Sequence, residues 1–489
     1  MKKCAVIGSG IAGLASAIRT AKQGFAVTVY ERNDHPGGKI SQYIKDGFRF
    51  DLGPSVFTLP ELIDELFTLW GKDPRDYFSY TRLDPAFHYF FEDGTCIVAH
   101  ADTDEFAREI EEKTIDNAQQ VKTYLKDVAR IYDITNEVFI EQSLHIATNF
   151  LKRKVVSGVL RFRHIHAFHS MDAGNRRFFM DPRNVQLFNY YATYVGSNPL
   201  VAPATLNVIQ HLEINLGTFM CNQGMYGIVE ALYQLAQDVG IKFVFNSVVT
   251  KILVENNRAT GIEINKSAFS FDIVISNMDI HNTYDRLIPE IKPPRLSLNQ
   301  PRSNSVIVLN WAMDKTFREL GVHNIFFSQD EEKEYNTIFN SAEVCDDPTV
   351  YVYISSKIAE KDAPEGCENW FLLVTVSYDK GQDWETLVQQ TGENIKTKLS
   401  RMLKTDVSRH ILFENQLSPR DIESRYLAYK GAVFGNSSNG KFAAFLRHPN
   451  FKRSVKNLYF SGGTVHPGAG IPMCLNSAKI VENLIERHH

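Results

Sequence analysis

The start of the chain alternates between two hydrophobic periodicities. Residues 4–7 form a short apolar run, apolar residues recur at helical spacing from Leu14 to Ala21, and residues 26–30 form a second run. A short apolar run is typical of a buried strand, and recurrence every three or four residues is typical of a helix. Because two parallel strands joined by one helix form a right-handed βαβ unit, we expect such a unit here.

The same periodicities predict further strands and helices along the chain. A hairpin is predicted at residues 86–99, with Asp93-Gly94 as its turn, and a mostly helical, polar-rich segment follows at 103–180. The other predicted strands lie near 242–254, 259–264, 271–276, 305–312, 349–355, 370–377 and 457–461, and the other helices at 227–239, 384–404 and 472–487.

Composition and charge exclude several classes of protein. A length of 489 residues suggests two or three domains, and a formal net charge of −4 gives no sign of a nucleic-acid partner. The cysteines form no CxxC pair, so neither a zinc site nor a disulfide framework is predicted, and a reducing cytosol fits this usage. Since no run of about 18 apolar residues occurs, no membrane-spanning helix is expected.

The glycine-rich turn of the first βαβ unit predicts a dinucleotide site. In Gly8-Ser9-Gly10-Ile11-Ala12-Gly13, Gly8 allows the tight turn, Gly10 lets phosphates approach the backbone, and Gly13 allows close packing of helix and strand. The helix N-terminus offers free N–H groups to the phosphates. Glu31 ends the second strand 18 residues after Gly13, where a carboxylate accepts hydrogen bonds from ribose hydroxyls.

Two segments behind this motif favour FAD over NAD. Pro36-Gly37-Gly38-Lys39 follows the second strand, and its paired glycines let the backbone approach a ligand. Lys39 or Arg32 is predicted to meet the pyrophosphate or the adenosine end. The glycines, aspartate and proline of residues 47–55 suggest a bent strand end that presses against the same ligand.

The end of the chain predicts a second contact with the flavin. Residues 460–473 form a glycine-rich loop, and Pro472 suits the first turn of the helix that follows. The partial positive charge of that N-terminus would favour negative charge on the reduced isoalloxazine near N1 and the C2 carbonyl. The residues predicted to bind FAD are Gly8, Ser9, Gly10, Ala12, Gly13, Glu31, Arg32, Gly38, Lys39, Gly53, Pro54, Ser55, Val248, Asn277, Gly463, Ile471 and Pro472.

Because segments of flavin-binding type occur at the start, middle and end of the chain, the nucleotide domain is predicted to be discontinuous. The predicted fold class is α/β, with a Rossmann-like FAD-binding domain of the glutathione-reductase or amine-oxidase type. An α+β substrate domain and a helical cap are inserted into it. The predicted boundaries are 1–85, 220–300 and 440–489 for the FAD-binding domain, 86–102, 181–219 and 301–439 for the substrate domain, and 103–180 for the cap.

Taken together, these motifs resemble the bacterial-type phytoene desaturase family, whose members act on carotenoids with FAD. Within that family, residues 465–473 look most like the hydroxycarotenoid 3,4-desaturase branch. Lys39 stands where many members carry arginine, and lysine cannot form a bidentate fork on a phosphate. The resemblance rests on residues 8–13, 37–38, 47–54, 196–199, 224–227, 276–279 and 462–473.

The resemblance implies a linear or monocyclic C40 carotenoid as substrate, bound in an apolar tunnel that leads to the flavin. Aromatic and leucine residues of 178–220 and 305–330 would line the tunnel. The implied reaction introduces a C=C bond by hydride transfer to flavin N5, as 3,4-desaturation of a 1-hydroxycarotenoid. The alternatives are phytoene desaturation, an amine or protoporphyrinogen oxidase, and a non-enzymatic isoprenoid-binding protein. No second nucleotide motif is present, so dioxygen or a membrane quinone is the expected electron acceptor.

Three residues are candidates for catalysis. His466 lies next to the flavin loop and is a candidate proton acceptor, although stabilising that loop is an equally good role. Asp172 and Arg176 belong to a polar cluster at the end of the cap, where an arginine could instead orient a hydroxylated end group. Since the histidines at 164, 166 and 169 have no evident partner ligands, no metal site is predicted.

One stretch has the pattern of a helix that lies in a membrane interface. In Leu151–Ser170, the apolar residues Leu151, Val155, Val159 and Phe162 fall on one helical face, and basic residues flank them: Lys152, Arg153, Lys154, Arg161 and Arg163. A solvated basic face on an ordinary cap helix is the alternative. The interfacial interpretation predicts a cytoplasmic protein associated peripherally with the inner face of the membrane.

Overall fold

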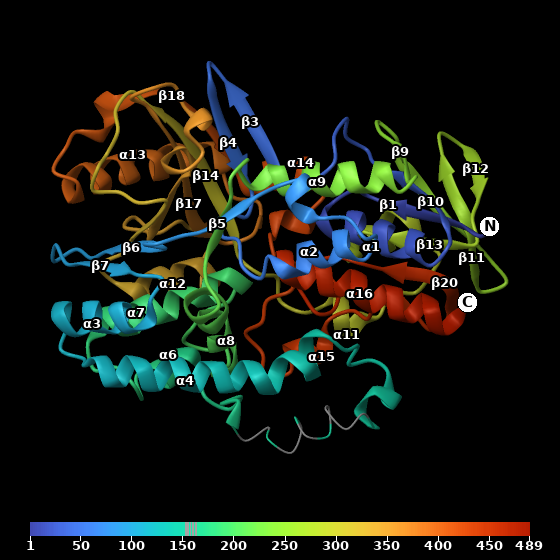
Figure 1. Ribbon diagram of the computed structural model, residues 1–489, viewed down its shortest axis with the longest axis horizontal. Coiled ribbons are helices and arrows are strands. Elements are labelled where there is room, and N and C mark those ends of the chain that lie inside the picture. The colour runs from blue at the N-terminus through green and yellow to red at the C-terminus, as the bar shows by residue number, and fades with distance from the viewer. Residues whose placement is uncertain (152–155, 157, 159–160, 162–163) are drawn as a thin grey trace.

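Two sheets organise the molecule in the computed structural model, which describes residues 1–151, 156, 158, 161 and 164–489 (Figure 1). The first sheet has the order β10-β11-β20-β13-β1-β2-β9, with β12 paired to β11 and β19 to β20. Its strands are β1 (Lys3–Ile7), β2 (Ala26–Tyr30), β9 (Lys242–Val244), β10 (Val249–Glu255), β11 (Arg258–Ile264), β12 (Ser267–Ser270), β13 (Ile273–Ser276), β19 (Phe451–Lys452) and β20 (Val455–Phe460).

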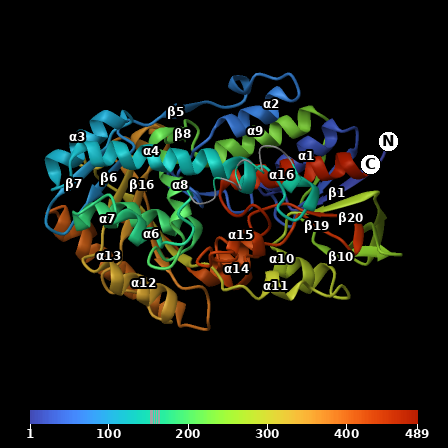
Figure 2. The ribbon, with the colours of Figure 1, turned by 90° about the horizontal axis from the view of Figure 1, so that it is seen from below.

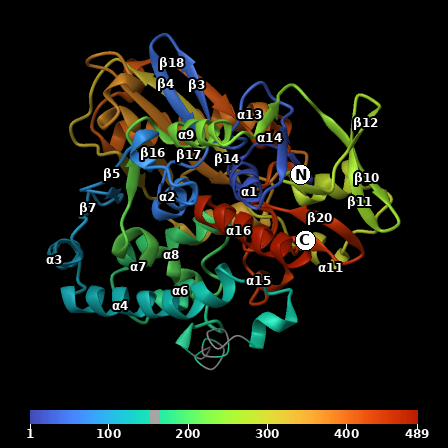
Figure 3. The same ribbon diagram turned by 45° about the vertical axis from the view of Figure 1, so that its right-hand side comes forward.

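The centre of this first sheet is parallel: β2, β1, β13 and β20 all run in the same direction. Helices α1 (Ile11–Lys22), α9 (Met225–Asp238) and α16 (Ile471–His488) cover it, and α1 lies beside α16 (Figure 3). Leu14 and Ile18 of α1 pack with Leu475 and Val481 of α16 in one core. On the other face, Ala5 and Ile7 pack with Tyr284 and Leu287, so β1 is buried from Cys4 to Ile7, as central parallel strands require.

The second sheet is mixed and has the order β18-β14-β17-β16-β15-β6-β7. Helix α13 (Trp384–Met402) covers one face, where Trp311 and Trp370 are fully buried. A second core, which includes Tyr124 and Phe188 of the cap helices, lies against the other face. The strands are β6 (Phe87–Phe90), β7 (Cys96–Ala99), β14 (Ser305–Met313), β15 (His323–Phe326), β16 (Val350–Ile354), β17 (Glu368–Val376) and β18 (Ile411–Leu417).

The cap helices lie along the underside of the molecule, where α4 (Ala118–Thr135) is the longest of those labelled there (Figures 1 and 2). Its start is fixed by Asn117, which forms a capping box with Gln120. The other named helices are α2 (Glu61–Thr68), α3 (Thr103–Lys113), α6 (Met171–Asn175), α7 (Pro182–Asn189), α8 (Val208–Gln210), α10 (Ile280–Asn282), α11 (Arg295–Leu298), α12 (Glu331–Asn340), α14 (Pro419–Tyr426) and α15 (Ala443–Leu446).

Short elements join the two sheets. Hairpin β3 (Ser41–Lys45)–β4 (Phe48–Leu52) stands between them, and β5 (Tyr80–Arg82) pairs with β8 (Phe219–Cys221). A 3₁₀ helix, η5 (Tyr190–Val195), and a π-helix, η7 (His211–Asn215), carry residues toward the space below the sheets. Both helices differ from regular α-helices in their hydrogen-bond pattern.

The predicted fold class is confirmed. Strands of the first sheet come from widely separated parts of the chain, and in the sequence the strands of the second sheet lie between those parts. The predicted strand at 242–254 is instead two strands, separated by residues 245–248 that run beside the end of β2. The exact domain boundaries stay a prediction. In the described residues, no helix is long and apolar enough to cross a bilayer.

The apolar face predicted within Leu151–Ser170 lies mostly outside the described residues. Lys152, Arg153, Lys154, Val155, Val159, Phe162 and Arg163 all fall there. Residues 165–170 are described, and they form turns that end in an isolated bridge between Ser170 and Pro203. The interfacial helix therefore stays a prediction.

Candidate active site

The glycine-rich loop between β1 and α1 is closed by tight backbone packing. Gly8 has a φ of +92°, and a Cβ at Gly13 would lie 2.2 Å from the Gly8 carbonyl oxygen. A Cβ at Gly10 would lie 2.8 Å from Asn277 Oδ1, while Asn277 Nδ2 donates to the Ser461 carbonyl at 2.7 Å. Asn277 therefore links the ends of β1, β13 and β20, and the loop needs glycine for this contact as well.

Glu31 holds the same loop against the end of β2. Its buried carboxylate accepts from Ser9 N at 2.8 Å, Ser9 Oγ at 2.7 Å and Asn33 N at 3.0 Å. Ser247 N donates to the Glu31 carbonyl at 2.8 Å, so Val248 lies beside this strand end. The structure thus brings together three residues that were predicted to bind FAD: Ser9, Glu31 and Val248.

The two basic residues predicted to contact the FAD phosphates or adenosine, Arg32 and Lys39, lie in different surroundings. Arg32 is exposed, and its Nη2 donates to the Ser424 carbonyl at 3.3 Å. Lys39 points inward, and its Nζ donates to the Val433 carbonyl at 2.7 Å. Burial lowers the pKa of Lys39, and the nearby Asp279 carboxylate opposes that shift. Of the two predicted cations, Lys39 is therefore the one that lies inside the molecule.

Helices α1 and α16 begin without side-chain caps. The N-cap residues are Gly10 and Gly470, and neither helix has an acidic residue in its first turn. Helix α9 differs, because Asp51 accepts from the backbone N–H groups of Met225 and Tyr226 at 2.9 and 3.1 Å. The unused donors and positive dipole ends of α1 and α16 suit an anionic ligand.

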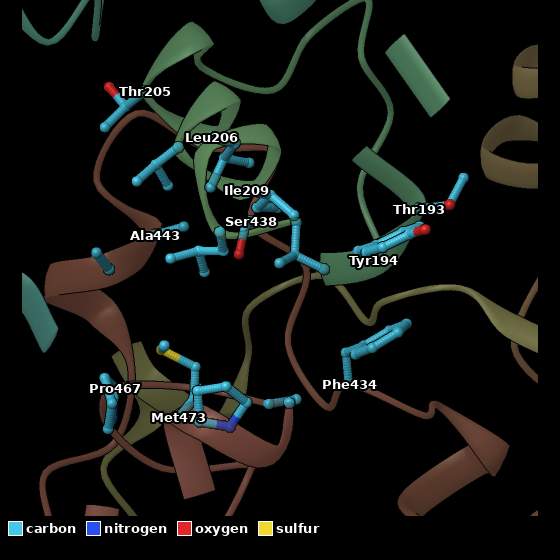
Figure 4. A pocket seen from close by; sticks show the side chains of 18 of the residues that line it. Thr193, Tyr194, Thr205, Leu206, Ile209, Phe434, Ser438, Ala443, Pro467 and Met473 are labelled. Carbon is cyan, nitrogen blue, oxygen red and sulfur yellow. The ribbon is translucent and has the colours of Figure 1, made fainter. Parts of the chain in front are cut away.

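A cavity of about 410 Å³ lies where the flavin-type segments meet the substrate side. Gly53, Pro54 and Ser55 form part of its wall, and residues 467–473 form another part. Most of the lining is apolar. Figure 4 shows the labelled side chains converging from η5, from the 3₁₀ helix η6 (Ala204–Asn207), from α8 and from the C-terminal part of the chain: Thr193, Tyr194, Thr205, Leu206, Ile209, Phe434, Ser438, Ala443, Pro467 and Met473.

These residues fit FAD. The glycine backbone of residues 8–13 allows close approach, two uncapped helices supply N–H donors, and Lys39 supplies a cation. The apolar cavity begins at Gly53 and Ile471, where a flat ring system would continue from the dinucleotide. A dinucleotide cradle that opens into an apolar cavity defines a flavin-dependent oxidoreductase.

Comparison with known proteins agrees with this class. Flavin containing amine oxidoreductase is the family matched by residues 11–481. The chain is 44% identical over 485 residues to the 1-hydroxycarotenoid 3,4-desaturase of Flavobacterium sp. (strain P99-3), covering 99% of each chain. It is 33% identical over 490 residues to the 4,4'-diapolycopene oxygenase of Methylomonas sp, covering 98% of this chain and 97% of the relative.

The fold is shared with wild-type putrescine oxidase bound to putrescine, at a TM-score of 0.65 and 14% identity over 100% of this chain and 99% of that one. The chain belongs to the flavin containing amine oxidoreductase family and, within it, to the carotenoid desaturase family that its motifs resemble. The predictions of FAD as cofactor and of an FAD-dependent oxidoreductase are confirmed.

His466 is buried next to the cavity loop but does not line the cavity. Its Nε2 lies 2.8 Å from the Gln142 carbonyl and donates to it, and its ring meets His145 edge to face at 5.5 Å. Burial lowers the pKa of His466 to about 3. Within the described residues its Nδ1 has no hydrogen-bond partner. The imidazole is therefore neutral at physiological pH, and its partner Gln142 does not line the cavity.

Asp172 and Arg176 form an ion pair on α6, with 2.8 Å between Oδ2 and Nε. Asn189 Nδ2 also donates to Asp172 at 3.0 Å. Neither Asp172 nor Arg176 lines the cavity of Figure 4. The structure thus does not bring the three catalytic candidates together, and their catalytic role stays a prediction. No group of three metal-ligating side chains is found in the described part of the chain.

Among the polar residues of the cavity wall, sequence reasoning missed Glu213 and Arg447, whereas Tyr194 belongs to the aromatic residues of 178–220 that the resemblance implied as a lining. Burial lowers the pKa of Arg447 to about 10, and its Nη2 donates to Ser438 Oγ at 2.9 Å. Glu213 is the one acidic residue between Val208 and Leu216, where apolar and polar residues are mixed, and that acidic residue is the signal that was available. Nothing in the sequence alone distinguishes Arg447 from an ordinary surface residue.

Proposed function

We propose that this protein is an FAD-dependent carotenoid desaturase that introduces a C=C bond into a linear or monocyclic C40 carotenoid, by 3,4-desaturation of a 1-hydroxycarotenoid. The observation that carries the proposal is the apolar cavity, whose wall includes both Gly53–Ser55 and Ile471. The relative with this named activity supports it, because the identity of 44% extends over 99% of each chain.

The chemistry divides between the cofactor and the chain. Bound FAD would supply the hydride acceptor, at flavin N5. The apolar residues of the cavity, among them Leu206, Ile209 and Phe434, hold the polyene and exclude water from it. The proton released in desaturation leaves to a water or to a basic group. Dioxygen or a membrane quinone serves as the final electron acceptor.

The residues that we propose to hold FAD are those predicted from the sequence, with Lys39 rather than Arg32 as the interior cation. Glu31 orients the loop through Ser9 while a free lone pair remains for a ribose hydroxyl. We assign His466 a positional role, because its ring N–H fixes the loop to Gln142. Asp172 and Arg176 likewise fix α6 to α7 through Asn189.

A carotenoid is insoluble in water, so the enzyme must collect it from a bilayer as a peripheral protein at the inner face of the membrane. Two exposed aromatic side chains near the cavity support this. Phe168 is 70% exposed and follows the cavity residue Ala167, and Phe442 is 67% exposed between the cavity residues Lys441 and Ala443. Lys441 lies over the Phe168 ring at 5.6 Å, which adds positive charge for anionic headgroups.

Expression in bacteria that accumulate different carotenoids tests the activity. We expect the pigment spectrum to shift to longer wavelength when the precursor carries a 1-hydroxyl group, and no shift with the precursor that lacks it. A shift with phytoene would instead favour phytoene desaturation. A colourless purified protein that gains no yellow chromophore with FAD, yet binds prenyl chains, would favour a non-enzymatic isoprenoid carrier.

A further inference from the structure

Glu213 is a buried carboxyl group in the wall of an otherwise apolar cavity. It belongs to the π-helix η7 and is 3% exposed. Its Oε1 accepts a hydrogen bond from the Tyr191 hydroxyl, whereas Oε2 has no partner among the described residues. No lysine, arginine or histidine of the described chain forms an ion pair with it. An unpaired charge at such a site is costly, so the neutral acid is the favoured form.

The side chains around Glu213 are uncharged phenols. Tyr89 OH lies 3.3 Å from Tyr191 OH, and the rings of Tyr191 and Tyr194 are 5.2 Å apart. Burial raises the pKa of Glu213 to about 8, and the hydrogen bond from Tyr191 opposes that rise. The titratable groups that sense Glu213 are all tyrosines whose own pKa values are raised: Tyr89, Tyr190, Tyr191, Tyr194 and Tyr351.

Tyr194 lines the same cavity as Glu213. It lines the cavity on η5, and Figure 4 shows its ring and hydroxyl opposite Phe434. The polar cluster also lies close to the flavin-type segment. Tyr351, within electrostatic reach of Glu213, has its hydroxyl 2.7 Å from Ser55 Oγ, and Ser55 follows the Gly53-Pro54 wall of the cavity.

We infer that Tyr194 and Glu213 form a subsite that receives the hydroxyl group at one end of the carotenoid. This inference rests on the proposed function and names its specificity determinant. A phenol and a neutral carboxyl group each donate and accept a hydrogen bond, as a tertiary alcohol does. A carotenoid without the hydroxyl group would leave these buried polar groups without a hydrogen-bond partner. A site of this kind therefore discriminates strongly against such a carotenoid. The 3,4 bond begins two bonds from the hydroxyl-bearing carbon, so a hydroxyl held here keeps that bond near Ser55.

The subsite also sets the direction of binding. Figure 4 shows Ala443 across the cavity from Tyr194, and Ala443 follows the exposed Phe442 in the sequence, while the lining residue Ala167 precedes the exposed Phe168. The hydroxylated end enters first, and the rest of the polyene extends back toward those phenylalanines.

Replacement of Glu213 tests the subsite in the full-length, FAD-loaded enzyme. Two carotenoids that differ only in the 1-hydroxyl group are compared by kcat/KM and, separately, by binding through quenching of protein fluorescence. Glu213→Leu is expected to reduce the preference for the hydroxylated carotenoid by about a hundredfold, because it removes the polar partner. Glu213→Gln keeps a neutral donor and acceptor, so it is expected to keep most of the preference.

Two further variants keep the test decisive. Tyr194→Phe removes the hydroxyl that lines the cavity and is expected to reduce the preference about tenfold, even if Glu213→Leu does not fold. Glu334→Gln is the matched control, since Glu334 is equally buried but bonds to Ser328 and Thr349 outside the cavity. It should leave the preference unchanged.

The outcomes separate the two proposals. An unchanged preference in both Glu213→Leu and Tyr194→Phe, with normal flavin absorbance, overturns the subsite. An enzyme that converts neither carotenoid, yet binds the hydroxylated one more tightly in a manner that depends on Glu213, overturns the proposed reaction and leaves the subsite standing.

Discussion

Gly13 and Gly392 both lie in helices, but the space around their Cα atoms differs. A Cβ at Gly13 would lie 2.2 Å from a backbone oxygen of Gly8, which cannot move without opening the loop. A Cβ at Gly392 in α13 would have only Leu309 nearby, at an ordinary 3.8 Å. The same substitution should therefore have opposite effects at the two positions.

We expect Gly13→Ala to lower the free energy of unfolding by about 2–3 kcal/mol and to abolish retention of FAD, because overpacking displaces the phosphate loop. Gly392→Ala should instead be neutral or stabilise by up to about 1 kcal/mol, since alanine favours helix. Thermal denaturation and the flavin absorbance of the purified proteins measure both effects. Full FAD retention in Gly13→Ala would contradict the packing role.

Glu331 provides a residue-scale test of pH dependence. Burial raises its pKa to about 8, and only Asn189 donates to it, at 3.4 Å. The unfolded chain releases this proton near the ordinary value of 4.5, and the folded chain keeps it until about pH 8. The folded state therefore binds more protons between these values, and its stability falls as the pH rises through that window.

Glu331→Gln removes this titration. We expect the unfolding free energy of the variant, relative to the parent, to increase from pH 5 to pH 8 and to level off above pH 8. Chemical denaturation at a series of pH values measures the difference. A difference that is constant across the series would show that Glu331 is ionised in the folded protein.

At the scale of elements, Asp51 joins the β3–β4 hairpin to α9. Its carboxylate accepts from two backbone N–H groups of α9 and pairs with Arg49 at 2.8 Å. Residues 47–55 were interpreted as a segment that presses on the ligand. The structure divides that segment, since Gly53, Pro54 and Ser55 line the cavity while Asp51 caps a helix.

We expect Asp51→Ala to cost about 3 kcal/mol in unfolding free energy, because it leaves a helix start uncapped and a buried guanidinium with one partner fewer. Asp102→Ala is the matched control. Asp102 caps the exposed start of α3 through Asp104 N and Glu105 N, and its loss should cost only about 1 kcal/mol. Equal melting temperatures for the two variants would refute the difference between them.

Local patterns predicted the nucleotide-binding elements well, because the glycine turn, the helix periodicity and the apolar strands each point to one structure. They predicted the substrate side less well. The helices η5 and η7 carry Tyr194 and Glu213 into the cavity, but neither has regular α-helical periodicity. The tyrosines near Glu213 include residues distant in the sequence, such as Tyr89 and Tyr351. No local sequence pattern predicts that these side chains lie together.

At the scale of the whole molecule, the cofactor cradle and the cavity lie between the two sheets, where segments distant in the sequence meet. Fingerprint motifs predicted Gly8–Gly13 and residues 462–473 as neighbours, and the structure places both around Asn277 and Ser461. His466 is a catalytic candidate because it lies next to one of those motifs, whereas Asp172 and Arg176 are candidates as a polar cluster at the end of the cap. The side chain of His466 does not line the cavity and bonds to Gln142, so its catalytic role stays a prediction.

The exposed phenylalanines near the cavity give the last prediction. Replacing Phe168 and Phe442 by serine should weaken binding to liposomes of phosphatidylcholine and phosphatidylglycerol by about tenfold for each residue, because each ring loses about 1.5–3 kcal/mol of transfer free energy at most. Phe269→Ser is the control, since Phe269 is also exposed, at 43%, but lies on β12 of the first sheet. Co-sedimentation measures the binding. If the double variant binds as the parent does, these side chains do not contact the bilayer, and the carotenoid enters by another face.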